Sequence, residues 1–233
     1  VFAISDRMPG GSHVLVSLEN GDNYYLNSRS KKARGPLSRM KGVVIESVAW
    51  DKHNATELST RVILVGSANG VIFETVIDAK AGKERYWKEV CNLKDPIPIC
   101  GLQFELFPTQ PSEPPKYFVM AATARPTRYY QFVGGPSFES LFADYSTPDR
   151  ESFIELPGDL PYSELHFYTK YLEERAKSFT LLTGVGVYHG TLRFGSQGSG
   201  DKVITDYALL PYPTLQLRSS PGGGGGGGAS GGV

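Results

Sequence analysis

Two cysteines, no net charge and no long apolar run are the first features of this 233-residue sequence. Cys91 and Cys100 are too few for a disulfide framework, and without a nearby histidine they make a poor zinc pattern. We interpret both as inert thiols in a reducing compartment. The balance of 24 basic and 24 acidic residues gives no support for nucleic acid or an anionic membrane as the main partner. No apolar run is long enough to span a bilayer.

Catalytic and cofactor-binding motifs are lacking as well. The glycine-rich segments Gly184–Gly190 and Gly195–Gly200 do not match a phosphate-binding loop between a strand and a helix, and no Gly-Lys-Ser/Thr triplet occurs. No histidines have paired metal-ligand spacing, and no serine lies in a nucleophile-elbow pattern. His13 and His166 fall in strand patterns, where we expect structural hydrogen bonds. We therefore predict a protein that is not an enzyme and has no catalytic residues, no cofactor and no metal.

What the sequence does contain is a strong hairpin signal between Ile63 and Asp78. Two β-rich runs flank Ala68-Asn69-Gly70. An Asn-Gly pair favours a tight two-residue turn in which both central residues take positive φ. The sequence predicts such a turn here.

This hairpin belongs to a longer unit that recurs along the chain. An alternating strand precedes it at Val43–Asp51, and another follows at Arg85–Leu93. The apolar pairs of the first strand in each unit are Phe2/Ile4, Val48/Trp50, Leu102/Phe104 and Leu165/Phe167. A repeat of roughly 40–50 residues with four strands is typical of a β-propeller blade. A β-sandwich is the alternative fold, but it does not predict this recurring order of apolar strand, loop and glycine-marked hairpin.

The predicted fold is therefore all-β, a WD40-like β-propeller with about four blades of four antiparallel strands. We place a partial propeller at residues 1–218, with blades at about 1–41, 43–93, 97–157 and 162–211. Residues 219–233 read as a glycine-rich loop or linker. We interpret this chain, which starts at Val1, as a segment excised from a longer protein. We therefore expect an incomplete ring, with the remaining blades beyond the end of this chain.

Longer insertions interrupt the later units. In Ser137–Tyr145, apolar residues at helical spacing predict a short helix, and Thr169–Lys177 is a weaker helical candidate.

The main candidate for a binding surface is the basic stretch Ser28–Lys41, which has no acidic residue. It could contact lipid headgroups or an acidic partner. It could equally be an outer strand and its loop, charged against edge pairing. The candidate contact residues are Arg29, Lys31, Lys32, Arg34, Arg39 and Lys41.

Several segments together resemble one known family. They are "GSHVLVSL", "VIESVAWD", "ILVGSANGVIFE", "YYQFVGG", "ESLFADY" and "LPYSELHFYT". In this order they are similar to the N-terminal propeller of the vacuolar protein sorting-associated protein 18 (deep orange) family. The resemblance covers about Val1 to Phe194 and leaves out the glycine-rich tail.

The resemblance implies a role that the spacings do not show. Members of this family are core subunits of the HOPS and CORVET tethering complexes, with a solenoid and a RING finger that this chain lacks. It implies a non-enzymatic interaction scaffold acting in vesicle tethering and fusion. The implied partners are other class C subunits and, indirectly, Rab GTPases and SNAREs. The implied location is the cytoplasm, peripheral on late endosomes and the vacuole or lysosome. The alternative is a propeller that binds phosphoinositide or anionic headgroups through residues 28–41.

Overall fold

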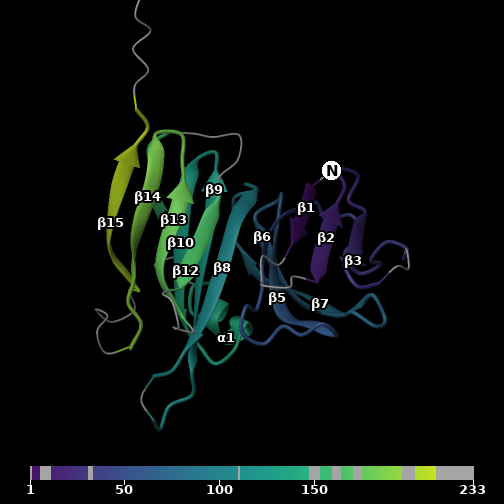
Figure 1. The fold of residues 1–233 in the computed structure, drawn as a ribbon. Coiled ribbons are helices and arrows are strands. Elements are labelled where there is room, and N and C mark those ends of the chain that lie inside the picture. The colour runs from purple at the N-terminus through teal and green to yellow at the C-terminus, as the bar shows by residue number, and fades with distance from the viewer. Residues whose placement is uncertain are drawn as a thin grey trace, which may run out of the picture.

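The computed structural model describes residues 2–5, 12–30, 34–109, 111–146, 153–158, 164–169, 175–195 and 203–213. Within these ranges the chain forms four antiparallel sheets that follow one another in sequence (Figure 1). The first sheet contains β1 (Phe2–Ser5), β2 (His13–Ser17) and β3 (Asn23–Asn27). The second contains β4 (Ile45–Ala49), β5 (Ser59–Ser67), β6 (Val71–Asp78) and β7 (Lys83–Asn92).

The other two sheets repeat the same plan. The third contains β8 (Ile99–Phe107), β9 (Lys116–Ala124), β10 (Thr127–Gly134) and β11 (Phe153–Glu155). The fourth contains β12 (Leu165–Thr169), β13 (Ala176–Leu182), β14 (Gly186–Leu192) and β15 (Ile204–Pro211). Every neighbouring pair is consecutive in the chain, so each sheet is a meander.

The sheets stack face to face as the blades of an open ring. Along the ring, β1 packs beside β4, β4 beside β8, and β8 beside β12. Figure 1 shows the resulting arc from β1–β3 at the right to β12–β15 at the left. The predicted apolar pairs mark these first strands, except that Trp50 directly follows β4. The β-propeller prediction is confirmed.

The core lies between the sheets because side chains alternate across each strand. In β2, for example, His13, Leu15 and Ser17 are buried and the residues between them are half-buried. Three apolar clusters fill the three junctions between neighbouring sheets. Burying one leucine, isoleucine or phenylalanine side chain contributes about 1.5–3 kcal/mol, so these junctions supply most of the stabilisation.

The hairpin between β5 and β6 exists, but its turn differs from the prediction. Residues 68–70 connect the strands, and only Gly70 has positive φ, at 76°. A three-residue loop with a final left-handed glycine is the next most common hairpin after the two-residue type. A Cβ on Gly70 would lie 2.2 Å from the Asp95 carbonyl oxygen, so the close approach of another loop also requires glycine.

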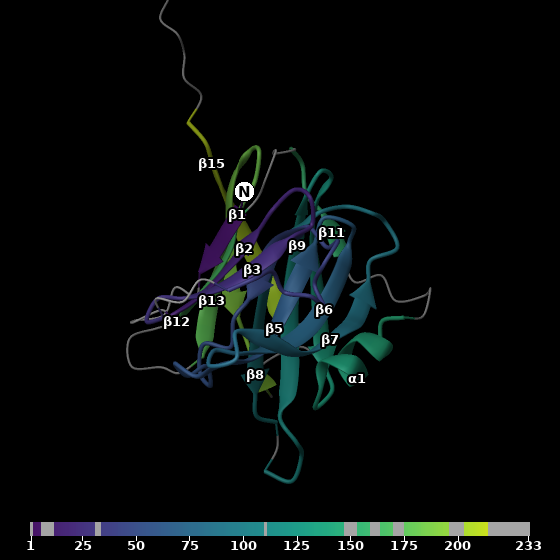
Figure 2. The same cartoon turned by 90° about the vertical axis from the view of Figure 1, so that its right-hand side faces the viewer.

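One of the two predicted helices is confirmed. Helix α1 spans Phe138–Ala143, is capped by Ser137, and lies beside β7 and β10 (Figure 2). The second candidate is wrong where the structure describes it, because Thr169 ends β12 and Ala176 begins β13. Residues 170–174 lie outside the described part of the chain.

The blade boundaries stay predictions. Among the described residues, the first sheet has three strands instead of the expected four. Residues 34–44, which follow it, contain turns and bends but no strand. The predicted linker at 219–233 lies outside the described residues.

Candidate functional site

The basic stretch is the connection between the first and second sheets, and its described part is not an outer strand. For the described residues that interpretation is wrong, because residues 34–41 contain bends and turns and belong to no sheet. Leu37 is 2% exposed and Met40 is fully buried, and both pack in the cluster between these sheets.

Asn23 at the start of β3 fixes the backbone of this segment. Its side-chain amide donates to the carbonyl oxygens of Met40 and Val43, each at 2.8 Å. The backbone carbonyl of Asn23 accepts from the Leu37 N–H at 2.7 Å. Buried carbonyls left without these donors would be costly, so Asn23 is a structural requirement of the connection.

Two of the predicted contact residues are engaged within the fold. The Arg34 guanidinium donates to the Lys80 carbonyl at 2.6 Å and lies against Gly82, leaving no room there for a Cβ. The Arg29 guanidinium forms an ion pair with Glu57. Both contacts tie the stretch to loops of the second sheet.

The remaining candidates divide into two groups. Arg39 and Lys41 are exposed, and neither side chain forms an ion pair within the described ranges. The Arg39 backbone N–H donates to Glu84 Oε1 at 2.6 Å. Lys31 and Lys32 lie outside the described residues. The structure therefore does not gather the described members of the stretch into one pocket.

A buried histidine joins the first two sheets. His13 Nε2 lies 2.7 Å from the Thr56 carbonyl, which can only accept, so Nε2 carries a proton. Its Nδ1 lies 2.6 Å from the Tyr25 hydroxyl, and its ring stacks on Trp50 with centroids 6.3 Å apart. The expected structural role of His13 agrees with this geometry.

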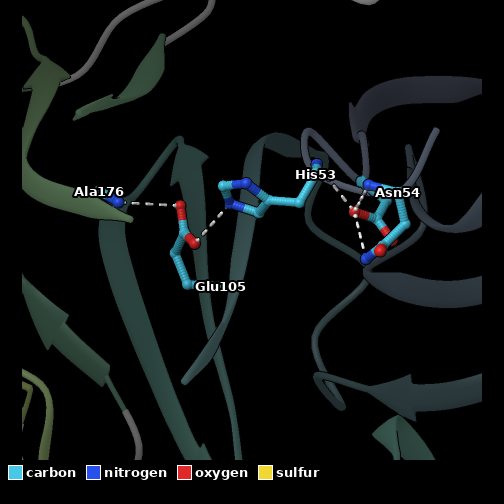
Figure 3. A network of polar contacts seen from close by, with 5 residues as sticks. His53, Asn54, Glu105 and Ala176 are labelled. Carbon is cyan, nitrogen blue, oxygen red and sulfur yellow. Dashed lines mark hydrogen bonds and ion pairs between the residues drawn. The ribbon is translucent and has the colours of Figure 1, made fainter. Parts of the chain in front are cut away.

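A second polar network joins the second, third and fourth sheets (Figure 3). Glu105 of β8 is 2% exposed, and its Oε2 lies 3.3 Å from His53 Nε2. Its Oε1 accepts from the Ala176 N–H of β13 at 3.3 Å. Asp51 holds the loop of His53 by accepting from the backbone N–H groups of His53 and Asn54.

Burial controls the electrostatics of this network. It raises the pKa of the Glu105 carboxyl, and the nearby His53 opposes that rise. Burial also lowers the pKa of Lys52, again opposed by Glu105. Sequence reasoning missed Glu105, whose only signal is a lone carboxylate in an otherwise apolar strand pattern. The network links three sheets.

Reactive groups are scarce in the part of the chain that the structure describes. There, no group of three or more His, Cys, Asp or Glu side chains could hold a metal ion. Burial raises the pKa of the Cys91 thiol to about 12, which keeps it protonated and a poor nucleophile. Among the same residues, no helix has the length and apolar character needed to cross a membrane.

Comparison with known proteins decides the family. Residues 8–222 match the family model described as the Pep3/Vps18/deep orange beta-propeller domain. The chain belongs to this family. The match covers all four sheets of the Pep3/Vps18 propeller described above except β1.

Curated relatives agree with the Pep3/Vps18 assignment. The chain is 40% identical over 215 residues to "Vacuolar sorting protein 18" of Arabidopsis thaliana, covering 89% of this chain and 21% of that protein. It is 37% identical over 202 residues to "Vacuolar protein sorting-associated protein 18 homolog" of Danio rerio, covering 80% and 20%. The chain thus spans about a fifth of the length of these relatives.

One solved structure is similar only remotely. It comes from a study of PorZ, a surface component of the type-IX secretion system of Porphyromonas gingivalis, with 10% identity and a TM-score of 0.29. The match covers 80% of this chain and 26% of that one. A likeness at this level supports no conclusion about function.

Proposed function

We propose that this propeller is a non-enzymatic interaction scaffold in a HOPS or CORVET tethering complex. The observation that carries the proposal is membership of the Pep3/Vps18 family, with relatives named for vacuolar sorting. Its direct partners would be other class C subunits, and Rab GTPases and SNAREs would be reached through the complex. Its location would be cytoplasmic, peripheral on late endosome and vacuole or lysosome membranes.

The inter-sheet contacts support a scaffold because they keep the sheets in fixed relative positions. Each described junction combines an apolar cluster with hydrogen bonds between sheets, such as His13 to Thr56 and Glu105 to Ala176. A surface that is already ordered loses little conformational entropy on binding. Such a platform can present loops from several blades to one partner.

The alternative of headgroup binding through residues 28–41 is less well supported. Arg29 and Arg34 are already engaged by Glu57 and Lys80. Among the described candidates, only Arg39 and Lys41 keep exposed side chains without an ion pair to another described residue. Two cations contribute on the order of 2 kcal/mol at an anionic surface, too little for stable attachment alone.

The test is co-purification of class C subunits on the protein, beside size-exclusion chromatography with light scattering. Capture of a sister subunit by a monodisperse protein, persisting at high salt, is the expected result. Absence of capture by a folded monomer would contradict the scaffold proposal. Retention by anionic vesicles that disappears with salt would instead support the headgroup alternative.

A further inference from the structure

A leucine at the tip of a tight turn is the most exposed large hydrophobic residue in the described part of the chain. Leu58 is 70% exposed. The turn is closed by two backbone bonds, from the Thr56 N–H to the Ser59 carbonyl at 2.9 Å and from the Ser59 N–H to the Thr56 carbonyl at 3.2 Å. Leu58 therefore projects from a two-residue loop on the second sheet.

Neighbouring elements hold this turn in place. His13 of β2 donates to the Thr56 carbonyl, and the Asn27 side-chain amide donates to the Glu57 carbonyl at 3.3 Å. On the other side, the Ala79 N–H donates to the Leu58 carbonyl at 2.9 Å. Three consecutive carbonyls of the turn are thus bonded to the rest of the fold. The backbone that carries the exposed leucine is therefore held in place, which lowers the entropy cost of binding to it.

Arginine and lysine residues lie close to the turn. Arg29 pairs with Glu57, and Lys80 lies one residue beyond Ala79 with Arg34 bonded to its carbonyl. Lys80 is exposed and forms no ion pair with another described residue. Asp78, which pairs with Ser59 of the turn across the sheet, forms an ion pair with Arg85 at 3.2 Å.

Arg61 adds a cation from an unusual backbone conformation. Its φ is 54°, in the left-handed region that residues other than glycine rarely adopt. The register of β5 with β6 shifts here, between Ser59 and Val62. Such bulges re-aim a side chain out of the strand pattern. Arg61 is exposed and has no ion pair among the described residues.

We propose that Leu58, Arg61 and Lys80, together the Leu58 patch, dock an acidic protein segment that carries an apolar pocket for Leu58. Charge complementarity selects the acidic partner, because Arg61 and Lys80 are exposed without an ion pair to another described residue, whereas Glu57 and Asp78 are already paired with Arg29 and Arg85. The proposal names the partner chemistry of one surface of the proposed scaffold and rests on that function.

A membrane fits the same patch less well. Stable insertion needs a broad apolar face, whereas this turn offers a single leucine held by three backbone contacts. One fixed apolar anchor with polar surroundings is the arrangement of a protein-interface anchor that fills one pocket. Vesicle binding is therefore an outcome that would overturn the proposal.

The experiment uses the full chain and a fluorescein-labelled peptide with a pair of central leucines flanked by glutamates. Fluorescence anisotropy measures its affinity for the wild type, for Leu58→Ser and for Arg61→Ala. We expect about a tenfold loss for Leu58→Ser and about a threefold loss for Arg61→Ala. A peptide with lysines in place of the glutamates should not bind.

Matched controls separate the patch from general surface effects. Leu210→Ser removes another exposed leucine, at 65% exposure on β15, and Lys116→Ala removes an exposed lysine of β9. Both should bind the acidic peptide like the wild type. Unchanged circular dichroism and thermal midpoints establish that each variant is folded.

Three results would overturn the inference. They are no acidic-peptide binding, equal losses in the controls, or capture by phosphatidylserine vesicles without peptide binding. Failure of the scaffold proposal has a different signature. In that case class C subunits do not co-purify with the wild type, whether or not the peptide binds.

Discussion

The first and last described junctions of the propeller are built by different means. Between the first and second sheets, the buried polar side chains of His13 and Asn23 add to the apolar cluster by bonding to a loop and to the linking segment. Between the third and fourth sheets, aromatic packing dominates, as where Phe118 stacks on Phe167 with centroids 5.8 Å apart. The comparison shows that the basic stretch beside the first junction contributes to the stability of the fold, in addition to any contribution to binding.

The largest expected effect comes from the aromatic junction. Phe118 is fully buried and contacts both Phe167 and Phe194. Phe118→Ala should lower the free energy of unfolding by about 3–5 kcal/mol, because it leaves a cavity. Chemical denaturation measures this loss. A loss below about 1 kcal/mol would show that this junction does not depend on its aromatic contacts.

The polar junction should respond almost as strongly to the loss of one amide. Asn23→Ala removes the donors to the Met40 and Val43 carbonyls, which stay buried. We expect a loss of about 2–4 kcal/mol in the free energy of unfolding. If Asn23→Ala and Phe118→Ala lower the free energy of unfolding by similar amounts, the two junctions contribute equally to stability. A near-neutral Asn23→Ala would remove the contrast between them.

A smaller, pH-dependent effect is expected at the junction between the second, third and fourth sheets. Burial raises the pKa of Glu105 in the folded chain above its unfolded value. The stability from its proton is fully present below the unfolded pKa and is lost as pH rises through the folded pKa. The stability of the wild type relative to Glu105→Gln should therefore fall with rising pH across that window.

Thermal or chemical unfolding of both proteins over a pH series measures this slope. His53→Ala is the matched variant, because it removes the partner that opposes the raised pKa of Glu105. It should make the slope extend to higher pH. A stability difference that does not change with pH would contradict the raised pKa.

The smallest expected effect is a difference in stability between two variants of the basic stretch, one at an arginine bonded within the fold and one at an exposed arginine. Arg34→Ala loses the hydrogen bond to the Lys80 carbonyl and should cost about 1 kcal/mol. Arg39→Ala removes an exposed side chain and should stay within about 0.5 kcal/mol of the wild type. Denaturation midpoints compare the two. Equal midpoints would show that the Arg34 contact does not stabilise the connection.

Much of the fold could be predicted because local sequence patterns indicate it. The alternating strands, the glycine at position 70 and the apolar spacing around Phe138 each depend on neighbours in the chain. The three-residue form of the turn could not be predicted, because an Asn-Gly pair fits more than one hairpin turn and the space at Gly70 is limited by the distant Asp95 carbonyl. The helix predicted for Thr169–Lys177 is wrong at its described ends, because Thr169 and Ala176 pair in a sheet, which overrides a weak helical pattern.

The sequence by itself determined the repeat of four-stranded units, and with it the propeller class and the family, because strand alternation and turn glycines are local signals. Only the tertiary structure decided what the charged residues do. It paired Arg29 with Glu57, bonded Arg34 to Lys80, buried Glu105 between sheets and left Leu58 exposed. The partners in these contacts are far apart in the chain. A local sequence pattern therefore does not show which charged side chains become buried or paired, or which apolar side chains stay exposed to solvent.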